Sequence, residues 1–79
     1  MTPPHRRRYR DISGHSGVAY YEPGATFIRI WFKSGEGYEY NEAHPGARHV
    51  AAMKQLAAEG QGLTTYINQH VRDDYAEKF

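Results

Sequence analysis

Basic and aromatic side chains alternate along one stretch of this sequence, FIRIWFK at positions 27–33. Side chains of a β-strand point alternately to its two faces, so Arg29, Trp31 and Lys33 would share one face, with Phe27 below them. Guanidinium and ammonium groups pair with phosphate oxygens, and an indole ring stacks on a nucleobase. The row therefore predicts a surface that binds single-stranded nucleic acid. The alternative is an outer face on which Trp31 is covered by a terminal segment or buried in a dimer.

A second group of basic residues lies near the start of the chain, around Tyr9: Arg6, Arg7, Arg8 and Arg10. Residues 1–16 show no periodicity and contain Pro3-Pro4 and several small polar residues. We therefore expect a basic N-terminal arm that is mostly disordered in isolation. Its guanidinium groups would hold phosphates while the ring of Tyr9 stacks on a base. The alternative is a solubilising tail without a specific partner.

Positive charge is concentrated in this arm. The formal net charge of the chain is +1, but outside residues 1–11 six basic residues face eight acidic ones, which gives −2. This distribution disfavours a broad basic footprint on the folded part. It places any attraction for nucleic acid mainly in the arm.

Composition also limits the compartment and the chemistry. The sequence has no cysteine, which excludes disulfides and thiolate catalysis and fits a reducing cytoplasm. No apolar run approaches the roughly 20 residues that span a bilayer, and no apolar segment follows the arginines as in a secretory signal. We expect a cytoplasmic protein without a membrane partner.

The row at 27–33 is expected to form the first strand of a β-hairpin. A two-residue loop, Ser34-Gly35, would place Glu39 on the same face as Ile30, whereas a loop of residues 33–35 places it beside Arg29. The longer loop also aligns each tyrosine of the second strand with an isoleucine of the first: Tyr38 with Ile30 and Tyr40 with Ile28. It puts Gly35 at the left-handed position of a bulged turn, where glycine is preferred. We therefore predict the three-residue loop, with Tyr38 and Tyr40 as structural residues of the core face instead of base-stacking ones.

Strands and helices follow in order along the chain. Three strands, Val18–Tyr21, Thr26–Phe32 and Glu36–Asn41, are predicted to form an antiparallel meander. The first helix should start at His44-Pro45, with proline at its first helical position, and stop at Gly60. The second begins near Leu63 or Thr64, and its predicted buried stripe is Leu63, Ile67, His70 and Val71. It should fray near Asp73 and Asp74, which oppose the helix dipole, and leave residues 75–79 as a docked or loose tail.

Few residues of the second helix point to chemistry. Asn68 and Arg72 lie one turn apart and face outward, so they would extend an anion site or simply pair with neighbouring carboxylates. The histidines lack the spacing of metal ligands, and His70 is expected to be a structural residue paired with Asp74. The sequence contains no nucleophile elbow and no evident catalytic carboxylate pair. We expect no catalysis, no cofactor and no metal.

The order of three passages resembles the KTSC family, small bacterial domains named after a C-terminal extension of some lysyl-tRNA synthetases. The passages are Ser16–Tyr21 leading into Ile28–Gly35, the central Tyr38-Glu39-Tyr40, and Gly62–Tyr75. Residues 41–46 depart from the usual Phe-Gly-Val-Pro entry to the first helix, and the arginine arm lies outside the resemblance. The function of the family is not established. Its attachment to a tRNA-handling enzyme implies RNA binding only by association.

The sequence therefore predicts one α+β domain at residues 17–79, with two helices packed on one face of a three-stranded meander, preceded by the basic arm 1–16. The predicted function is non-catalytic binding of RNA or another single-stranded nucleic acid through the arm and the outer sheet face. The alternative is a protein-interaction or homodimerisation module centred on Phe27 and Trp31.

Overall fold

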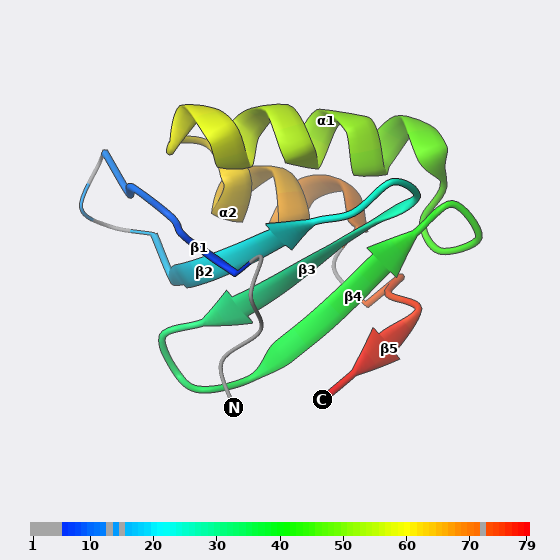
Figure 1. Cartoon of the computed structure of the whole chain (residues 1–79), viewed down its shortest axis with the longest axis horizontal. Helices are drawn as coiled ribbons and strands as arrows, with labels where there is room; N and C mark the ends of the chain where they lie inside the picture. Colours follow the sequence, from blue (N-terminus) through cyan, green and yellow to red (C-terminus); the bar gives the residue numbers. More distant parts are fainter. Residues whose placement is uncertain (1–5, 13, 15, 72) are drawn as a thin grey trace.

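The computed structural model describes residues 6–12, 14, 16–71 and 73–79. It is an α+β domain in which an antiparallel sheet carries its helices on one face (Figure 1). The sheet has five strands, hydrogen-bonded in sequence order from β1 to β5. The predicted α+β class is confirmed. The predicted three-stranded sheet is too small, because each terminal segment adds a short strand.

The three long strands form the predicted meander, and two short strands flank it: β1 Arg7–Arg8, β2 Val18–Pro23, β3 Phe27–Phe32, β4 Gly37–Asn41 and β5 Glu77–Lys78. Between β3 and β4, Ile28 pairs with Tyr40 and Ile30 pairs with Tyr38. Gly35 has a φ of 100° in the connecting loop, a conformation that glycine adopts without steric cost. The register of the three-residue loop is therefore confirmed.

Helical segments cover one face of this sheet. Helix α1 spans Ala47–Glu59 and ends at Gly60, which takes the left-handed conformation, as predicted. Helix α2, Leu63–Tyr66, continues directly into a π-helical turn, η1, Ile67–Val71. Figure 1 shows α1 and α2 stacked above the strands on the same side.

The prediction that Pro45 is the first residue of α1 is wrong, because Asn41 organises a separate turn before the helix. The Asn41 side-chain oxygen accepts hydrogen bonds from the backbone N–H groups of Ala43 and His44, both at 2.9 Å. Its carbonyl oxygen accepts another from Gly46 at 3.1 Å. Pro45 lies inside this turn, and the helix starts after it.

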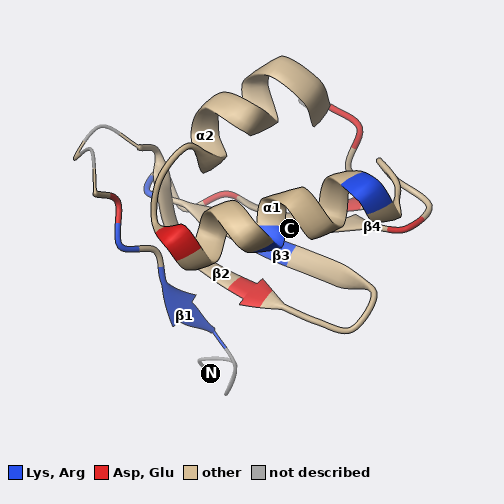
Figure 2. Ribbon diagram, turned by 90° about the horizontal axis from the view of Figure 1, so that it is seen from above, with Lys and Arg blue, Asp and Glu red and all other residues tan. Residues whose placement is uncertain are grey.

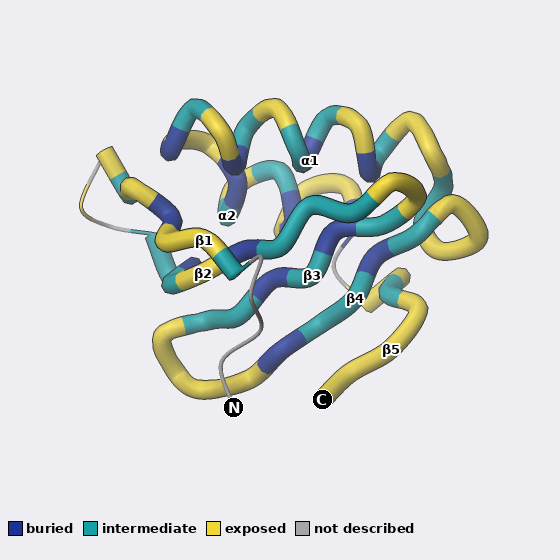
Figure 3. The backbone as a smooth tube through the Cα atoms, viewed as in Figure 1, coloured by how far each residue is buried: buried dark blue, intermediate teal, exposed yellow. Residues whose placement is uncertain are grey.

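The core lies between the sheet and the helices (Figure 3). Ile28, Ile30 and Tyr40 are at most 1% exposed on the sheet side. The helices contribute the other half of the core: Val50, Met53, Ala57, Leu63, Ile67 and Val71. The two tyrosine positions and most of the stripe predicted for the second helix therefore lie where the sequence places them.

His70 is exposed, contrary to its predicted place in the buried stripe. The π-helical turn carries i→i+5 hydrogen bonds and is wider than an α-helical turn, so Ile67 and Val71 point inward while His70 is rotated outward. Its ring packs on Tyr66, with centroids 4.5 Å apart. The predicted pairing of His70 with Asp74 is also wrong, since Asp74 contacts His44 at 3.2 Å.

The prediction of a disordered N-terminal arm is wrong for residues 6–12. Arg7 and Arg8 pair with Tyr21 and Tyr20 of β2. The ring of Tyr9 is only 3% exposed and belongs to the core. Burying an aromatic ring of this size stabilises the docked segment by roughly 1.5–3 kcal/mol, which outweighs the absence of a periodic pattern. Residues 1–5, 13 and 15 of the predicted arm lie outside the described residues.

Arg10 fixes the same segment to the helical layer. Its Nη2 group donates hydrogen bonds to the carbonyl oxygens of Ala58 at 2.7 Å and Glu59 at 3.0 Å. These carbonyls end α1, and a cation at a helix C-terminus interacts favourably with the helix dipole. Arg10 therefore acts as a helix cap.

The C-terminal segment is docked, which was one of its two predicted states. Gly37 and Phe79 exchange two backbone hydrogen bonds, each 2.8 Å long. A Cβ atom on Gly37 would lie 2.6 Å from the Phe79 ring, so this contact requires glycine. Among the described residues, no helix combines the length and the apolar character needed to cross a bilayer.

Candidate functional site

The sheet surface opposite the helices, here named the outer face, carries the central part of the predicted binding row. It is formed by Tyr20, Glu22, Phe27, Arg29, Trp31, Glu39 and Phe79, so two of the predicted binding residues, Arg29 and Trp31, belong to it. Tyr20 pairs with Trp31, and Arg29 lies between the two glutamates across neighbouring strands. The predicted sharing of one face by Arg29, Trp31 and Glu39 is confirmed.

Arg29 is neutralised by carboxylates on both sides. Its Nε donates to Glu39 Oε1 at 2.9 Å, and its Nη1 lies 3.5 Å from Glu22 Oε1. The hydrogen bond to Glu39 is the main reason that the pKa of Arg29 is raised above its usual value. A phosphate contact at Arg29, as the sequence predicts, would compete with this cross-strand network.

Lys33 is ion-paired as well. Its Nζ lies 2.8 Å from Asp11 Oδ2. The hydrogen bond from Lys33 holds the pKa of Asp11 below its ordinary value. Two of the three residues predicted to form the basic row are thus compensated within the chain.

Trp31 is half-buried and flanked by both terminal segments. The Phe79 ring centroid lies 6.0 Å from that of Trp31. The guanidinium carbon of Arg6 lies 5.1 Å from the Trp31 ring centroid and 3.8 Å from that of Tyr20. The structure therefore shows the alternative in which terminal segments partly cover the indole. Tyr20, which is 36% exposed, is an aromatic residue of this face that the sequence analysis did not single out.

Uncompensated positive charge gathers at the β1 edge. Most basic residues of the described chain bind carboxylates or backbone carbonyls: Arg10, Arg29, Lys33, Lys54 and Lys78. Four arginines bind neither a carboxylate nor a backbone carbonyl of a described residue: Arg6, Arg7, Arg8 and Arg48. The first three lie together in and next to β1, and Arg48 lies on α1 (Figure 2). Arg72, also predicted as a contact, lies outside the described residues.

A pocket of about 460 Å³ adjoins the β1 edge. Arg8, Tyr20 and Lys33 are among the residues that line it, together with Arg10 and Asp11. The pocket combines three cationic side chains with one carboxylate. We name it the basic pocket.

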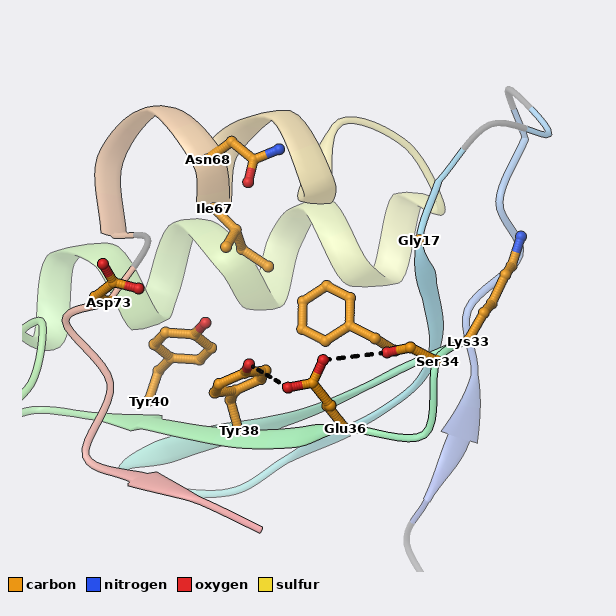
Figure 4. A pocket seen from close by; sticks show the side chains of 10 residues that line it. Gly17, Lys33, Ser34, Glu36, Tyr38, Tyr40, Ile67, Asn68 and Asp73 are labelled. Carbon is orange, nitrogen blue, oxygen red and sulfur yellow. Dashed lines mark hydrogen bonds between the residues drawn. The ribbon is translucent and has the colours of Figure 1, made fainter.

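A second pocket, of about 380 Å³, opens between the β3–β4 hairpin and η1 (Figure 4). We name it the hairpin pocket. Its walls include the rings of Phe32, Tyr38 and Tyr40, and Asn68 lies above them. Lys33 lines both pockets, so they are neighbours.

One side of the hairpin pocket is closed by bonds within the chain. The Tyr38 hydroxyl donates to Glu36 Oε2 at 3.0 Å, and the same oxygen lies 3.0 Å from Lys78 Nζ. The bond from Lys78 is the main cause of the lowered pKa of Glu36. These contacts fix the Tyr38 ring, which meets the Phe32 ring edge-on at 5.5 Å.

The other side of the hairpin pocket carries polar groups without partners. Tyr40 is 1% exposed, yet its hydroxyl forms no hydrogen bond with a described residue. The side chains of Asn68 and Asp73 likewise form none within that part of the chain, and both line the pocket. The sequence did not indicate that Asp73 lines a pocket. The one available signal was a carboxylate at a helix C-terminus, where it is locally unfavourable.

Among the described residues, no group of three metal-binding side chains comes together. His49 instead shares a 2.7 Å hydrogen bond with the Tyr66 hydroxyl, and His70 packs on the Tyr66 ring. The bond between His49 and Tyr66 joins α1 to the second helical segment.

Comparisons with models of protein families, with curated proteins and with solved structures gave no match. The resemblance to the KTSC family therefore stays a prediction that rests on the sequence motifs alone.

Proposed function

We propose that this protein is a non-catalytic module that binds RNA or another single-stranded nucleic acid at the β1 edge of its sheet. The observation that carries the proposal is the clustering of uncompensated charge. Arg6, Arg7 and Arg8 have no carboxylate partner among the described residues, whereas the arginine and lysine of the central row are ion-paired. Unpaired guanidinium groups bind phosphates without first breaking an ion pair.

Aromatic rings next to this edge support the proposal. The guanidinium group of Arg6 lies over Tyr20 and near Trp31. A guanidinium group held over a ring can still donate from its terminal N–H groups, which suits a phosphate. The Arg6 Nε is itself buried without a hydrogen-bond partner. The rings thus orient an arginine, and exposed parts of Tyr20 offer a surface for a base.

The test uses Trp31, the only tryptophan, as a fluorescent probe during titration with a mixed 12-nucleotide single-stranded RNA at low and moderate salt. Binding should weaken with salt, with a slope of about −0.7 in log K against log salt for each phosphate neutralised. The double variant Arg7→Gln/Arg8→Gln should bind about tenfold more weakly and show a shallower slope. Fluorescence anisotropy of labelled RNA gives an independent readout.

Arg48→Gln is the matched control, because Arg48 is exposed and unpaired like Arg8 but lies on α1. It should bind RNA as tightly as wild type. Equal affinities for the β1 variant and the Arg48 variant would show that position on the sheet edge does not matter, and the proposal would be abandoned.

A protein-interaction module is the second candidate, favoured by the apolar part of the outer face. Phe79 is 49% exposed and lies against Trp31, and no helix in the described chain covers this face. Exposed aromatic patches of this kind commonly mark interfaces. Native mass spectrometry at micromolar concentration tests self-association: a dimer that dissociates in Trp31→Ala would favour this candidate, and a monomer would exclude a homodimer.

A further inference from the structure

We infer that the hairpin pocket binds one unstacked nucleobase and that a guanine-type base fits it best. The inference rests on the proposed function, because the base would belong to the strand whose phosphates lie at the β1 edge. It goes beyond that function by naming a second contact, on the helix side of the sheet, and by assigning a base preference.

The hydroxyl of Tyr40 has no hydrogen-bond partner among the described residues, although the residue is only 1% exposed. It is not one of the fully buried unpartnered atoms, so its remaining exposure lies at the pocket, and Figure 4 shows it directed toward the space below η1. A largely buried tyrosine hydroxyl usually has a hydrogen-bond partner, in the protein or in water. A bound ligand that displaces water from the pocket would supply a direct partner. Burial also raises the pKa of Tyr40, so the phenol stays protonated and can donate.

The hairpin pocket combines aromatic walls with polar groups. Phe32 and Tyr38 provide aromatic surface held in place by their mutual contact and by Glu36. A volume of about 380 Å³ falls in the usual range of small-ligand sites. A planar heterocycle can stack on such aromatic walls. Proteins recognise bases that are splayed out of a single strand by stacking and by hydrogen bonds to the base edges.

The polar groups that line the hairpin pocket favour one type of base. Asp73 offers carboxylate oxygens, which only accept hydrogen bonds, and no described residue occupies them. Guanine presents two adjacent N–H donors, N1–H and the N2 amine, to such an acceptor pair, and its carbonyl oxygen accepts from a group such as the Tyr40 hydroxyl or the Asn68 amide. Uracil presents one N–H group between two carbonyls, which matches a carboxylate poorly.

The position of the hairpin pocket agrees with a nucleic-acid strand that runs along the β1 edge. Lys33 lines both the hairpin pocket and the basic pocket, and its side chain extends away from the former, toward the N-terminal segment (Figure 4). A phosphate bound by Arg8 at the basic pocket would therefore have the hairpin pocket as its neighbour. A nucleic-acid strand held there could place one of its bases in the hairpin pocket.

The experiment titrates the protein with guanosine, inosine and uridine, followed by amide chemical shifts in NMR spectra. Nucleosides lack phosphate, so this measurement is independent of the arginines. Guanosine should shift amides around Tyr40 and Asn68. Inosine, which lacks only the N2 amine, should bind about tenfold more weakly, and uridine more weakly still. Equal binding of the three nucleosides, or shifts confined to β1, would overturn the inference.

Two pairs of variants sharpen the test. Asp73→Asn should lose the preference for guanosine over inosine, while Asp74→Asn, the adjacent exposed carboxylate, should keep it. Asn68→Ala should weaken guanosine binding, while Gln69→Ala should not. Both control residues lie outside the lining of the pocket. A guanosine affinity unchanged in Asp73→Asn would contradict the assignment.

The outcomes separate this inference from the proposed function. If guanosine binds in the pocket but RNA binds at no salt concentration, the proposed function fails and the pocket stands as a nucleoside site. If RNA binds in a salt-dependent way but with no base preference, the pocket assignment fails and the β1 edge stands.

Discussion

Strands β1 and β3 both carry arginines that the sequence predicts as phosphate contacts. The arginine of β3 is ion-paired, whereas those of β1 are not paired with any described carboxylate. Arg29, in the central strand β3, is held between carboxylates of the strands on either side. The arginines of β1, an edge strand, have a described neighbour on one side only, and that neighbour offers them no ion pair. A basic residue in the middle of a sheet has two cross-strand positions at which a carboxylate can pair with it, whereas an edge residue has one. The availability of a charge therefore depends on its place in the sheet more than on the density of basic residues in the sequence.

The arginines of β1 keep their positions only if β1 is fixed to the domain. Removing the Tyr9 side chain, which anchors β1, should have the largest effect on stability. Tyr9→Ala should lower the free energy of unfolding by about 3–5 kcal/mol, because a buried aromatic ring is replaced by a cavity. Urea denaturation followed by circular dichroism measures it. Tyr20→Ala, on the outer face, should cost less than about 1 kcal/mol. A small loss in Tyr9→Ala would show that the segment does not dock.

Replacing one paired arginine and one unpaired arginine by glutamine, each in its own variant, tests directly whether the difference between β1 and β3 matters for binding. Arg29→Gln leaves Glu22 and Glu39 without their shared cation and should destabilise the fold by about 0.5–1 kcal/mol while leaving RNA affinity nearly unchanged. Arg8→Gln should do the reverse, with unchanged stability and weaker RNA binding. Thermal unfolding and RNA titration of both variants suffice. If Arg29→Gln weakens RNA binding more than Arg8→Gln does, the central row is the contact surface after all.

The ion pair between Lys33 and Asp11 predicts a smaller, pH-dependent effect. Lys33 lowers the pKa of Asp11 in the folded state. A carboxyl group of this kind stabilises the fold above its unfolded-state pKa, and the stabilisation is lost as the pH falls through the folded-state pKa. Wild type should therefore lose more stability on acidification than Asp11→Asn. Urea midpoints measured from neutral pH into the acid range test this, and parallel profiles for the two proteins would contradict it.

The smallest expected effect is that of Tyr40→Phe. Because the Tyr40 hydroxyl has no partner among the described residues, its removal should change the free energy of unfolding by no more than about 0.5 kcal/mol. The same variant should weaken guanosine binding. A loss of stability above about 1.5 kcal/mol would mean that the hydroxyl is bonded inside the folded protein, which would remove the main argument for a ligand in the hairpin pocket.

Local patterns in the sequence predict the central part of the fold well. The hairpin register follows from alternation of side chains together with Gly35 in the loop, and the end of α1 follows from Gly60. Both depend on neighbours within a few residues. The start of α1 and the orientation of His70 could not be predicted in this way, because they depend on the turn built by Asn41 and on the π-helical turn of η1.

The candidate sites could be predicted only in part. The sequence identifies the arginines of the N-terminal arm and the two tyrosines of the hairpin as candidate residues. It does not show which basic side chains form ion pairs with carboxylates in the folded protein. Asp11 reaches Lys33 across 22 residues, and Arg10 reaches Ala58 across 48. Contacts at such separations leave no periodic signal. The same is true of the hairpin pocket, which joins β4 to Asn68 and Asp73.

The sequence by itself determined which residues of the β3–β4 hairpin face the core, how β3 pairs with β4 and where the first helix ends, because these features follow from backbone preferences and from the period of apolar side chains. The tertiary structure alone decided that the N-terminal segment docks through Tyr9, that Arg29 and Lys33 are neutralised, and that Tyr40, Asn68 and Asp73 share one pocket. The physical reason is that charge compensation and pocket formation depend on distances between segments remote in the chain.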